Sequence, residues 1–259
     1  MARKSSTAER RHRWIALSAA LALWGALVGG VVAYRMLDGG PTERTVTMDE
    51  ASRLALARLN LYQAAPVAVT LTADEGGGVV LKVSGVVDYR THRAVGSYGS
   101  AGSAAGTPLD HGLIVWDADG LGLAPALDSS PAWQQAEHLP RSGWSPRAYT
   151  SDPLDSGLQL LIGLGADRPD NPLLLAQSGA RWLGRERIDG QDCDRIAGPR
   201  AQGATPAPGN GDSPLTYWVD GNGDLRRVTM RLPGLGTPTT LEFGGHDATA
   251  KLPDAPWAT

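Results

Sequence analysis

The hydrophobic and polar positions of the chain change pattern twice. Residues 14–34 are an unbroken run without a charged side chain. In residues 48–64 the apolar positions recur at helical spacing, and from residue 67 onward they mostly alternate with polar positions. A period of two is typical of strands that bury one face. We therefore predict an apolar segment, then one helix, then an antiparallel sheet.

The uncharged run at 14–34 predicts a transmembrane helix. Its 21 residues, at about 1.5 Å per residue, match the roughly 30 Å hydrocarbon layer of a bilayer. Trp14 and Tyr34 border the run, where aromatic residues favour the membrane interface. Two other interpretations stay open: a signal peptide, which usually has a shorter apolar region and a small-residue cleavage site, and a buried soluble helix.

Basic residues set the predicted topology. Residues 1–13 contain five Lys and Arg against one Glu, and basic residues favour the cytoplasmic flank of a membrane helix. We predict a basic cytoplasmic tail, a transmembrane helix, a linker, an extracytoplasmic α+β domain and a C-terminal tail, at residues 1–13, 14–34, 35–45, 46–253 and 254–259. The predicted localisation is the cell membrane, single-pass, with the N-terminus in the cytoplasm.

Local signals predict three helices in the exported part. Thr47 and Glu50 match a capping box, which predicts a helix over 48–64. Apolar residues cover more than half of its circumference, so we expect it to be substantially buried. Shorter helices are predicted at 130–138 and 153–164, because proline opens both segments and suits a first helical turn.

Alternating segments predict the strands of one sheet. The clearest hairpin turn is Asp220-Gly-Asn-Gly-Asp224. We expect 85–98 to be extended throughout, and the glycine- and proline-rich segments 96–108 and 198–214 to be loops. The predicted fold class is α+β, with an antiparallel sheet covered on one face by helices. The alternating segments are 67–72, 79–83, 215–219 and 228–232. The segments 112–116 and 121–124 are predicted as the arms of a hairpin, and 239–243 as another strand.

Composition excludes several kinds of site. The 259 residues include 24 Lys and Arg against 27 Asp and Glu, a net charge of −3, which gives no electrostatic basis for nucleic-acid binding. The single cysteine cannot form an intramolecular disulfide or a cysteine-based zinc site. Cys193 lies between Asp192 and Asp194, whose charges raise the pKa of a thiol and disfavour a nucleophile. A buried thiol and an intermolecular disulfide both stay open.

Motifs for catalysis are missing from the sequence. It contains no nucleophile elbow, phosphate-binding loop or zinc-protease motif. The turn at 220–224 resembles the start of an EF-hand loop, but Arg231 stands where the bidentate glutamate belongs. We therefore predict a protein that is not an enzyme, with no catalytic residue, no metal site and no cofactor.

Two sequence motifs indicate a family resemblance. The first runs from Asn171-Pro-Leu-Leu-Leu through Ala180-Arg-Trp-Leu-Gly to Ile188-Asp-Gly-Gln-Asp-Cys, and the second is Tyr217-Trp-Val-Asp followed by Gly223-Asp-Leu-Arg-Arg. With these motifs the chain resembles membrane-anchored actinobacterial envelope proteins of the LppX/LprG-like and LolA-like lipoprotein-carrier superfamily, over about residues 45–250. The resemblance implies a curved antiparallel half-barrel with helices over its concave face, which holds an acyl chain or another apolar ligand.

The predicted function is a membrane-tethered extracytoplasmic module that binds a lipid or other apolar ligand. The alternative is a scaffold or regulatory ectodomain that binds an envelope protein and has no ligand cavity, and an exported enzyme is the third hypothesis. Expected partners are the membrane through residues 14–34, an apolar ligand and an envelope protein, but no nucleic acid. Alternation places the ligand site on the inward-facing strand residues Val69, Leu71, Leu81, Val83, Tyr217, Val219, Val228 and Met230.

Overall fold

The computed structural model describes most of the chain after residue 42, namely residues 43–101, 111–199 and 213–256. The chain divides into two compact units, Met1–Thr42 and Glu43–Thr259, and all described residues belong to the second. The predicted cytoplasmic tail, transmembrane segment 14–34 and most of the linker therefore lie outside the described residues. The predicted domain boundaries stay predictions.

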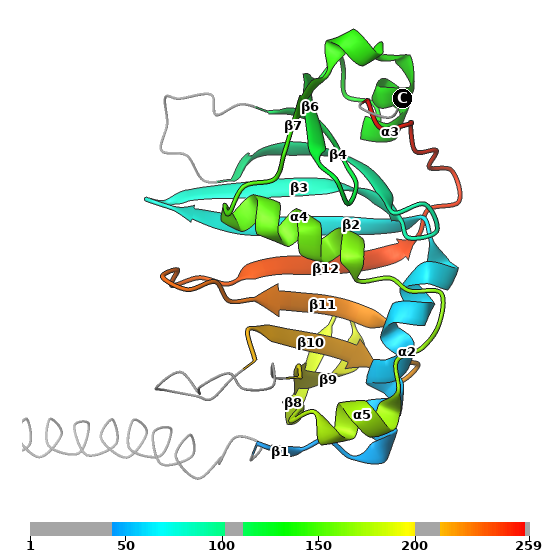
Figure 1. The fold of residues 1–259 in the computed structure, drawn as a ribbon, viewed down its shortest axis with the longest axis vertical. Helices are drawn as coiled ribbons and strands as arrows, with labels where there is room; N and C mark the ends of the chain where they lie inside the picture. The colour runs from blue at the N-terminus through cyan, green and yellow to red at the C-terminus, as the bar shows by residue number, and fades with distance from the viewer. Residues whose placement is uncertain (1–42, 102–110, 200–212, 257–259) are drawn as a thin grey trace, which may run out of the picture. The chain divides into compact units, whose positions relative to one another are not determined.

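The described residues build one antiparallel sheet of twelve strands (Figure 1). The order across the sheet is β1-β8-β9-β10-β11-β12-β2-β3-β4-β5-β6-β7. The C-terminal strand β12 pairs with β2 and so joins the two halves of the sheet. The strands are β1 (Arg44–Thr45), β2 (Val67–Gly76), β3 (Val79–Asp88), β4 (Arg93–Ala101), β5 (Gly112–Trp116), β6 (Leu121–Pro125), β7 (Ser145–Arg147), β8 (Arg181–Ile188), β9 (Gln191–Ala197), β10 (Leu215–Asp220), β11 (Leu225–Met230) and β12 (Thr239–His246).

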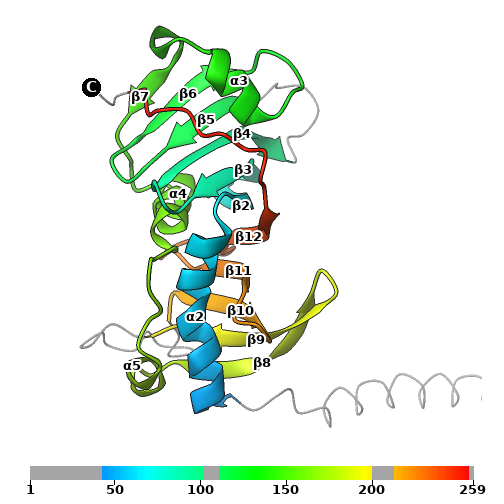
Figure 2. The ribbon, with the colours of Figure 1, turned by 90° about the vertical axis from the view of Figure 1, so that its right-hand side faces the viewer.

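Helices pack on both faces of this sheet (Figure 2). One cluster of buried side chains joins α2 and α4 to one face of the sheet. A second cluster joins α3 to the opposite face of β3–β6. Val87 and Ile114 belong to the first cluster, whereas their chain neighbours Val86 and Leu113 belong to the second. The helices are α2 (Met48–Ala64), α3 (Ala132–His138), α4 (Pro153–Gly163) and α5 (Pro172–Gln177), with a 3₁₀ turn at Arg141–Gly143.

The predicted fold class is wrong. The sequence predicted a transmembrane helix followed by a half-barrel with helices on one face, whereas the described residues form a large twelve-stranded sheet with few helices. The prediction assumed that each strand is apolar on one side only, whereas all five residues of β5 are buried. Both faces of this strand are covered, which is what a continuous apolar run such as Gly112-Leu-Ile-Val-Trp116 indicates.

The predicted localisation needs the same correction. Within residues 43–101, 111–199 and 213–256, no helix is long and apolar enough to cross a membrane. The longest helix there is α2, which has 17 residues and carries Asp49 and Glu50 in its first turn. A single-pass membrane protein is therefore not supported by the structure, and neither is membrane tethering.

The helix predicted over 48–64 is confirmed as α2, which begins and ends at those residues. Both halves of the capping box form: the Glu50 backbone N–H donates to Thr47 Oγ1 at 3.3 Å, and the Thr47 N–H donates to the Glu50 carboxylate at 2.8 Å. These bonds satisfy donors that the first turn of a helix leaves free. The cap therefore sets where α2 starts.

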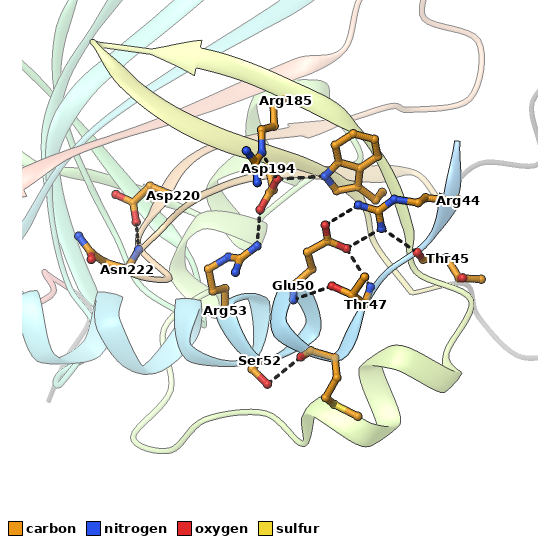
Figure 3. Close-up of polar contacts among 12 residues, drawn as sticks. Arg44, Thr45, Thr47, Glu50, Ser52, Arg53, Arg185, Asp194, Asp220 and Asn222 are labelled. Carbon is orange, nitrogen blue, oxygen red and sulfur yellow. Dashed lines mark hydrogen bonds and ion pairs between the residues drawn. The ribbon is translucent and has the colours of Figure 1, made fainter. Parts of the chain in front are cut away.

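Two buried carboxylates join the start of α2 to the sheet (Figure 3). Arg44 donates to both oxygens of Glu50, at 2.8 and 2.6 Å, and its guanidinium lies 4.2 Å above the centre of the Trp182 ring. On the next turn Arg53 donates to Asp194 of β9 at 2.5 Å, and the Trp182 indole N–H donates to the same carboxylate at 3.0 Å. The network holds α2 across β8 and β9.

The segment 85–98 is a hairpin, which corrects the prediction of a continuous extended segment. β3 ends at Asp88, whose side chain accepts from the Arg90 backbone N–H at 3.0 Å. His92 adopts a left-handed φ of 50° and completes the reversal into β4. An aspartate that bonds the backbone two residues ahead is a common turn device, but the turn contains no glycine to mark it. β4 also continues to Ala101, inside the predicted loop 96–108.

Candidate functional site

An apolar pocket lies between α2, the connector that joins α4 to α5 (residues 164–171), and the sheet. Its volume is about 300 Å³, at the lower end of the range for small-molecule sites. Leucines form most of its walls, and the polar side chains of the lining are Arg58, Asp170 and Tyr217. The lining residues are Leu54, Ala57, Arg58, Leu160, Gly163, Leu164, Asp170, Leu175, Pro199, Tyr217 and Leu225.

The connector 164–171 is attached to α2 through the backbone. The Ala166 N–H donates to the Arg58 carbonyl at 3.1 Å, and the Asp170 N–H donates to the Ala55 carbonyl at 3.0 Å. Carbonyls inside a helix already accept one intrahelical bond, and their second lone pair takes these donors. The connector is thereby held along α2, and Leu164 and Asp170 are placed at the pocket.

Arg58 holds the C-terminal end of α4. Its Nε donates to the Leu164 carbonyl at 3.2 Å, and Nη2 donates to the Gly163 carbonyl at 3.3 Å. These carbonyls are among those that the last turn of a helix leaves without a partner, and a cation is favourable at this negative end. Nη1 also contacts the Asp170 carboxylate at 3.3 Å, with both side chains more than one third exposed.

Tyr217 supplies the aromatic wall of the pocket. Burial raises the pKa of its phenol; the nearby charge of Arg58 lowers that pKa and the charge of Asp170 raises it. The ring packs over Gly198, since a Cβ at residue 198 would lie 2.7 Å from the Tyr217 Cε2. A side chain at this position would push the ring aside, so Gly198 leaves the space in which the ring lies.

The short helix α5 closes another side of the pocket. Asn171 caps it by accepting from the backbone N–H groups of Leu173 and Leu174, at 2.9 and 3.4 Å, and Pro172 occupies its first position. Leu175 faces the pocket. Leu173 and Leu174 are 56% and 63% exposed. The helix therefore directs one leucine inward and two toward solvent.

The eight predicted ligand residues lie on one face of the sheet, the face that α2 and α4 cover. Cross-strand pairing aligns Tyr217 with Val228 and Leu71 with Val83. Of the eight, only Tyr217 lines the pocket. Leu81, Tyr217 and Met230 are half-buried. The other five, which are buried in the core, are Val69, Leu71, Val83, Val219 and Val228.

Sequence reasoning missed most of the pocket because its walls come from helices and loops. Alternation identifies the inward face of a strand but not what covers it. Leu160 and Leu175 lie on helices, and Arg58 lies on a turn of α2 whose neighbours are leucine and alanine. A single arginine on an otherwise apolar stretch of helix is the one signal that could have pointed to the site.

A second, more polar pocket adjoins the first and shares Arg58. Its volume is about 460 Å³ and its lining includes Arg90, His92 and Asp167. Arg90 donates to the Gln63 carbonyl in the last turn of α2 at 2.8 Å. A ring nitrogen of His92 lies 3.2 Å from the Ile162 carbonyl of α4. The two side chains thus contact backbone carbonyls near the C-terminal ends of α2 and α4.

Chemical groups outside the pockets offer little for catalysis. Among the residues that the structure describes, no group of three or more His, Cys, Asp or Glu could hold a metal ion. Cys193 is a free and buried thiol. Burial first, and then the nearby Asp220, raises the pKa of this thiol. A buried thiol is thus the interpretation that the structure favours for Cys193.

Comparisons with known proteins give little. No family model matches the chain, and no curated protein sequence matches it. An uncharacterized conserved protein from Thermus thermophilus has a TM-score of 0.35 and 12% identity, over 75% of this chain and 87% of that one. A putative outer membrane lipoprotein-sorting protein domain from Vibrio parahaemolyticus has a TM-score of 0.20 and 10% identity, over 70% and 82%. The resemblance predicted from the two sequence motifs is accompanied by a distant structural hit to a lipoprotein-sorting domain, but no family model and no curated sequence matches.

Neither TM-score reaches 0.5, so the likenesses to these two structures decide nothing about activity. The pocket itself is the informative feature. A large antiparallel sheet that leaves an apolar pocket beneath its helices is compatible with a ligand-binding module.

Proposed function

We propose that the domain of residues 43–256 is a non-enzymatic binding module that holds one small apolar ligand in the pocket beneath the connector 164–171. The observation that carries the proposal is the lining: Leu54, Leu160 and Leu175 converge from three different helices on a space of about 300 Å³. Five of the predicted strand residues are covered by the protein's own helices, so the proposed site is this pocket and not the whole sheet face.

The apolar lining gives the expected driving force. Each methylene group that moves from water into such a pocket contributes about 0.8 kcal/mol, and a ligand must exceed the cost of being immobilised. The pocket is small, so a short acyl chain is a suitable probe. We expect the purified full chain to bind methyl decanoate with a stoichiometry of one in native mass spectrometry.

Ala57→Phe tests the location of the site. Ala57 is buried and lines the pocket, so a phenyl ring at this position occupies the space of the ligand. We expect affinity for methyl decanoate to fall by at least about tenfold, which corresponds to losing the burial of two or more methylene groups. Leu56→Phe is the matched control, because Leu56 is the preceding residue of the same helix and is 38% exposed.

Equal binding by both variants and the wild type would show that the probe binds elsewhere. No binding by the wild type would reject the proposed function. A melting curve of each variant separates a filled pocket from a damaged fold, since a folded Ala57→Phe protein keeps a cooperative transition.

The scaffold alternative has one observation in its favour. Leu173 and Leu174 are adjacent and exposed on α5, and exposed apolar side chains that cluster mark interaction sites. If α5 docks a protein, a partner that co-purifies at fixed stoichiometry is lost in Leu174→Glu and retained in Ala57→Phe. The reverse pattern assigns the partner to the pocket.

A further inference from the structure

Arg58 has hydrogen-bonding capacity that the described residues do not use. A guanidinium carries five N–H donors. Three of them are used, by the Leu164 carbonyl, the Gly163 carbonyl and the Asp170 carboxylate. The donors that stay free belong to the two terminal nitrogens, and Arg58 lines the apolar pocket. Arg58 therefore brings a cationic group with spare donors to the lining of a leucine-rich space, which suits the oxygen atoms of an amphiphile.

The charges around Arg58 leave room for an incoming anion. Asp170 makes a single contact with Arg58, at 3.3 Å, which is long for an ion pair between a guanidinium and a carboxylate. Tyr217 lines the same pocket from the sheet side.

We infer that the ligand is a fatty carboxylate, whose hydrocarbon chain lies among Leu54, Leu160 and Leu175 and whose carboxylate accepts hydrogen bonds from Arg58. This inference rests on the proposed function, since it assigns a chemical class to the ligand of the same pocket. A carboxylate has two oxygens that can accept from these donors, and hydrogen bonds between ionised partners are stronger than neutral ones. An alkane or an alcohol would leave at least part of this capacity unused.

The test compares decanoate with its methyl ester, which has the same chain but no charge. Affinities of both probes are measured by isothermal titration calorimetry for the full-length wild type, Arg58→Gln and Arg90→Gln. Arg90→Gln is the matched control, because Arg90 caps α2 and lines the polar pocket but is not among the residues that line the apolar pocket. The readout is the change in the affinity ratio of the two probes, which cancels their different hydrophobicities and any general loosening of the pocket.

We expect Arg58→Gln to lower the affinity for decanoate about fivefold more than that for methyl decanoate, as suits a partly exposed charge pair. Arg90→Gln leaves the ratio unchanged. A second variant, Asp170→Asn, removes the competing carboxylate at almost constant shape and strengthens decanoate binding while methyl decanoate is unaffected. Added salt weakens the binding of decanoate but not that of methyl decanoate.

The outcomes separate the inference from the function on which it rests. If methyl decanoate binds and Arg58→Gln changes both affinities equally, the inference is overturned and the apolar pocket stands. If Arg90→Gln lowers the ratio of the decanoate and methyl decanoate affinities as much as Arg58→Gln does, the inference is also overturned. The effect would then come from positive charge in general and not from Arg58. If the wild type binds neither probe, the proposed function itself fails.

Discussion

The two ends of α4 are held by the same residue types in opposite surroundings. At the N-terminal end Asp155 is completely buried, and it accepts from Arg147 at 2.6 and 2.8 Å and from Thr150 at 2.7 Å. At the C-terminal end Arg58 and Asp170 meet once, at 3.3 Å, with both side chains still partly in water. The Arg147–Asp155 pair is thus part of the packed interior, whereas the Arg58–Asp170 pair lies at the apolar pocket.

The packing of α4 also differs between its two ends. A Cβ at Gly157 would lie 2.8 Å from Cδ1 of Leu71 and 3.0 Å from Cγ2 of Thr239, while a Cβ at Gly163 would meet nothing within 4 Å. Close approach of α4 to β2 thus depends on Gly157, and the helix then leaves space as it nears its C-terminal end. The space for a ligand therefore lies at the C-terminal end of α4, where Arg58 and Asp170 are partly exposed to water and no atom lies close to Gly163.

Removing Asp155 should produce the most severe loss of stability. Asp155→Ala leaves Arg147 and Thr150 without their shared acceptor, and removing one partner of a buried pair is strongly destabilising. We expect the free energy of unfolding to fall by about 2–3 kcal/mol. This is less than for a fully buried pair, because water can reach Arg147, which is 38% exposed. Urea denaturation of the wild type and Asp155→Ala measures this loss of stability.

Asp152→Ala is the control for that substitution. Asp152 precedes α4 as its N-cap residue but makes no side-chain capping bond, so its loss should change stability by no more than about 0.5 kcal/mol. Equal losses in the two variants would show that Asp155 acts only through the helix dipole and not through its buried contacts.

Substitution of the two glycines of α4 by alanine should change the stability in opposite directions. Gly157→Ala forces Leu71 and Thr239 to move and should cost about 1–2 kcal/mol. Gly163→Ala meets no atom and should stabilise the helix by about 0.5 kcal/mol, because alanine loses less conformational entropy than glycine. Thermal melts of both variants measure the pair, and a loss from Gly163→Ala would mean that this end of α4 is as tightly packed as the other.

Glu50 extends the comparison to a third carboxylate, at the start of α2. Hydrogen bonds from Arg44, outweighing the effect of burial, lower its pKa from 4.5 to about 2. A carboxylate with a depressed pKa in the folded state adds stability above its unfolded pKa, and that contribution disappears as the pH falls through the folded value. We expect Arg44→Gln to be less stable than the wild type near neutral pH, and the difference to shrink between pH 4.5 and about 2.

The control for this titration is Arg181→Gln. Arg181 pairs with Glu43, and both side chains are exposed by about one third or more. An exposed pair contributes little, so this variant should follow the wild type at every pH. A gap between wild type and Arg44→Gln that stays constant down to the lowest pH would show that Arg44 stabilises through its contact with Trp182 and not through the charge of Glu50.

Local signals predicted the parts of the fold that depend on neighbouring residues. The cap at Thr47 located α2 to the residue, and the turn after Asp220 located the β10–β11 hairpin. The layers could not be derived in this way, because whether α3 packs on one face or the other is decided by contacts between distant segments. The candidate site was missed for the same reason: Tyr217 was found by alternation, whereas Arg58 and Leu175 enter through helix packing and a connector.

Asp170→Asn should change stability far less than Asp155→Ala does, and this expectation tests the comparison most directly. Its contact with Arg58 is long and partly exposed, so the loss should not exceed about 0.5 kcal/mol. The backbone bond from residue 170 to the Ala55 carbonyl survives the substitution and keeps the connector in place. Urea denaturation at low and high salt measures the change. A loss as large as that of Asp155→Ala would mean that the Arg58–Asp170 pair closes the fold as firmly as the buried pair does, and a ligand could then enter only by breaking it.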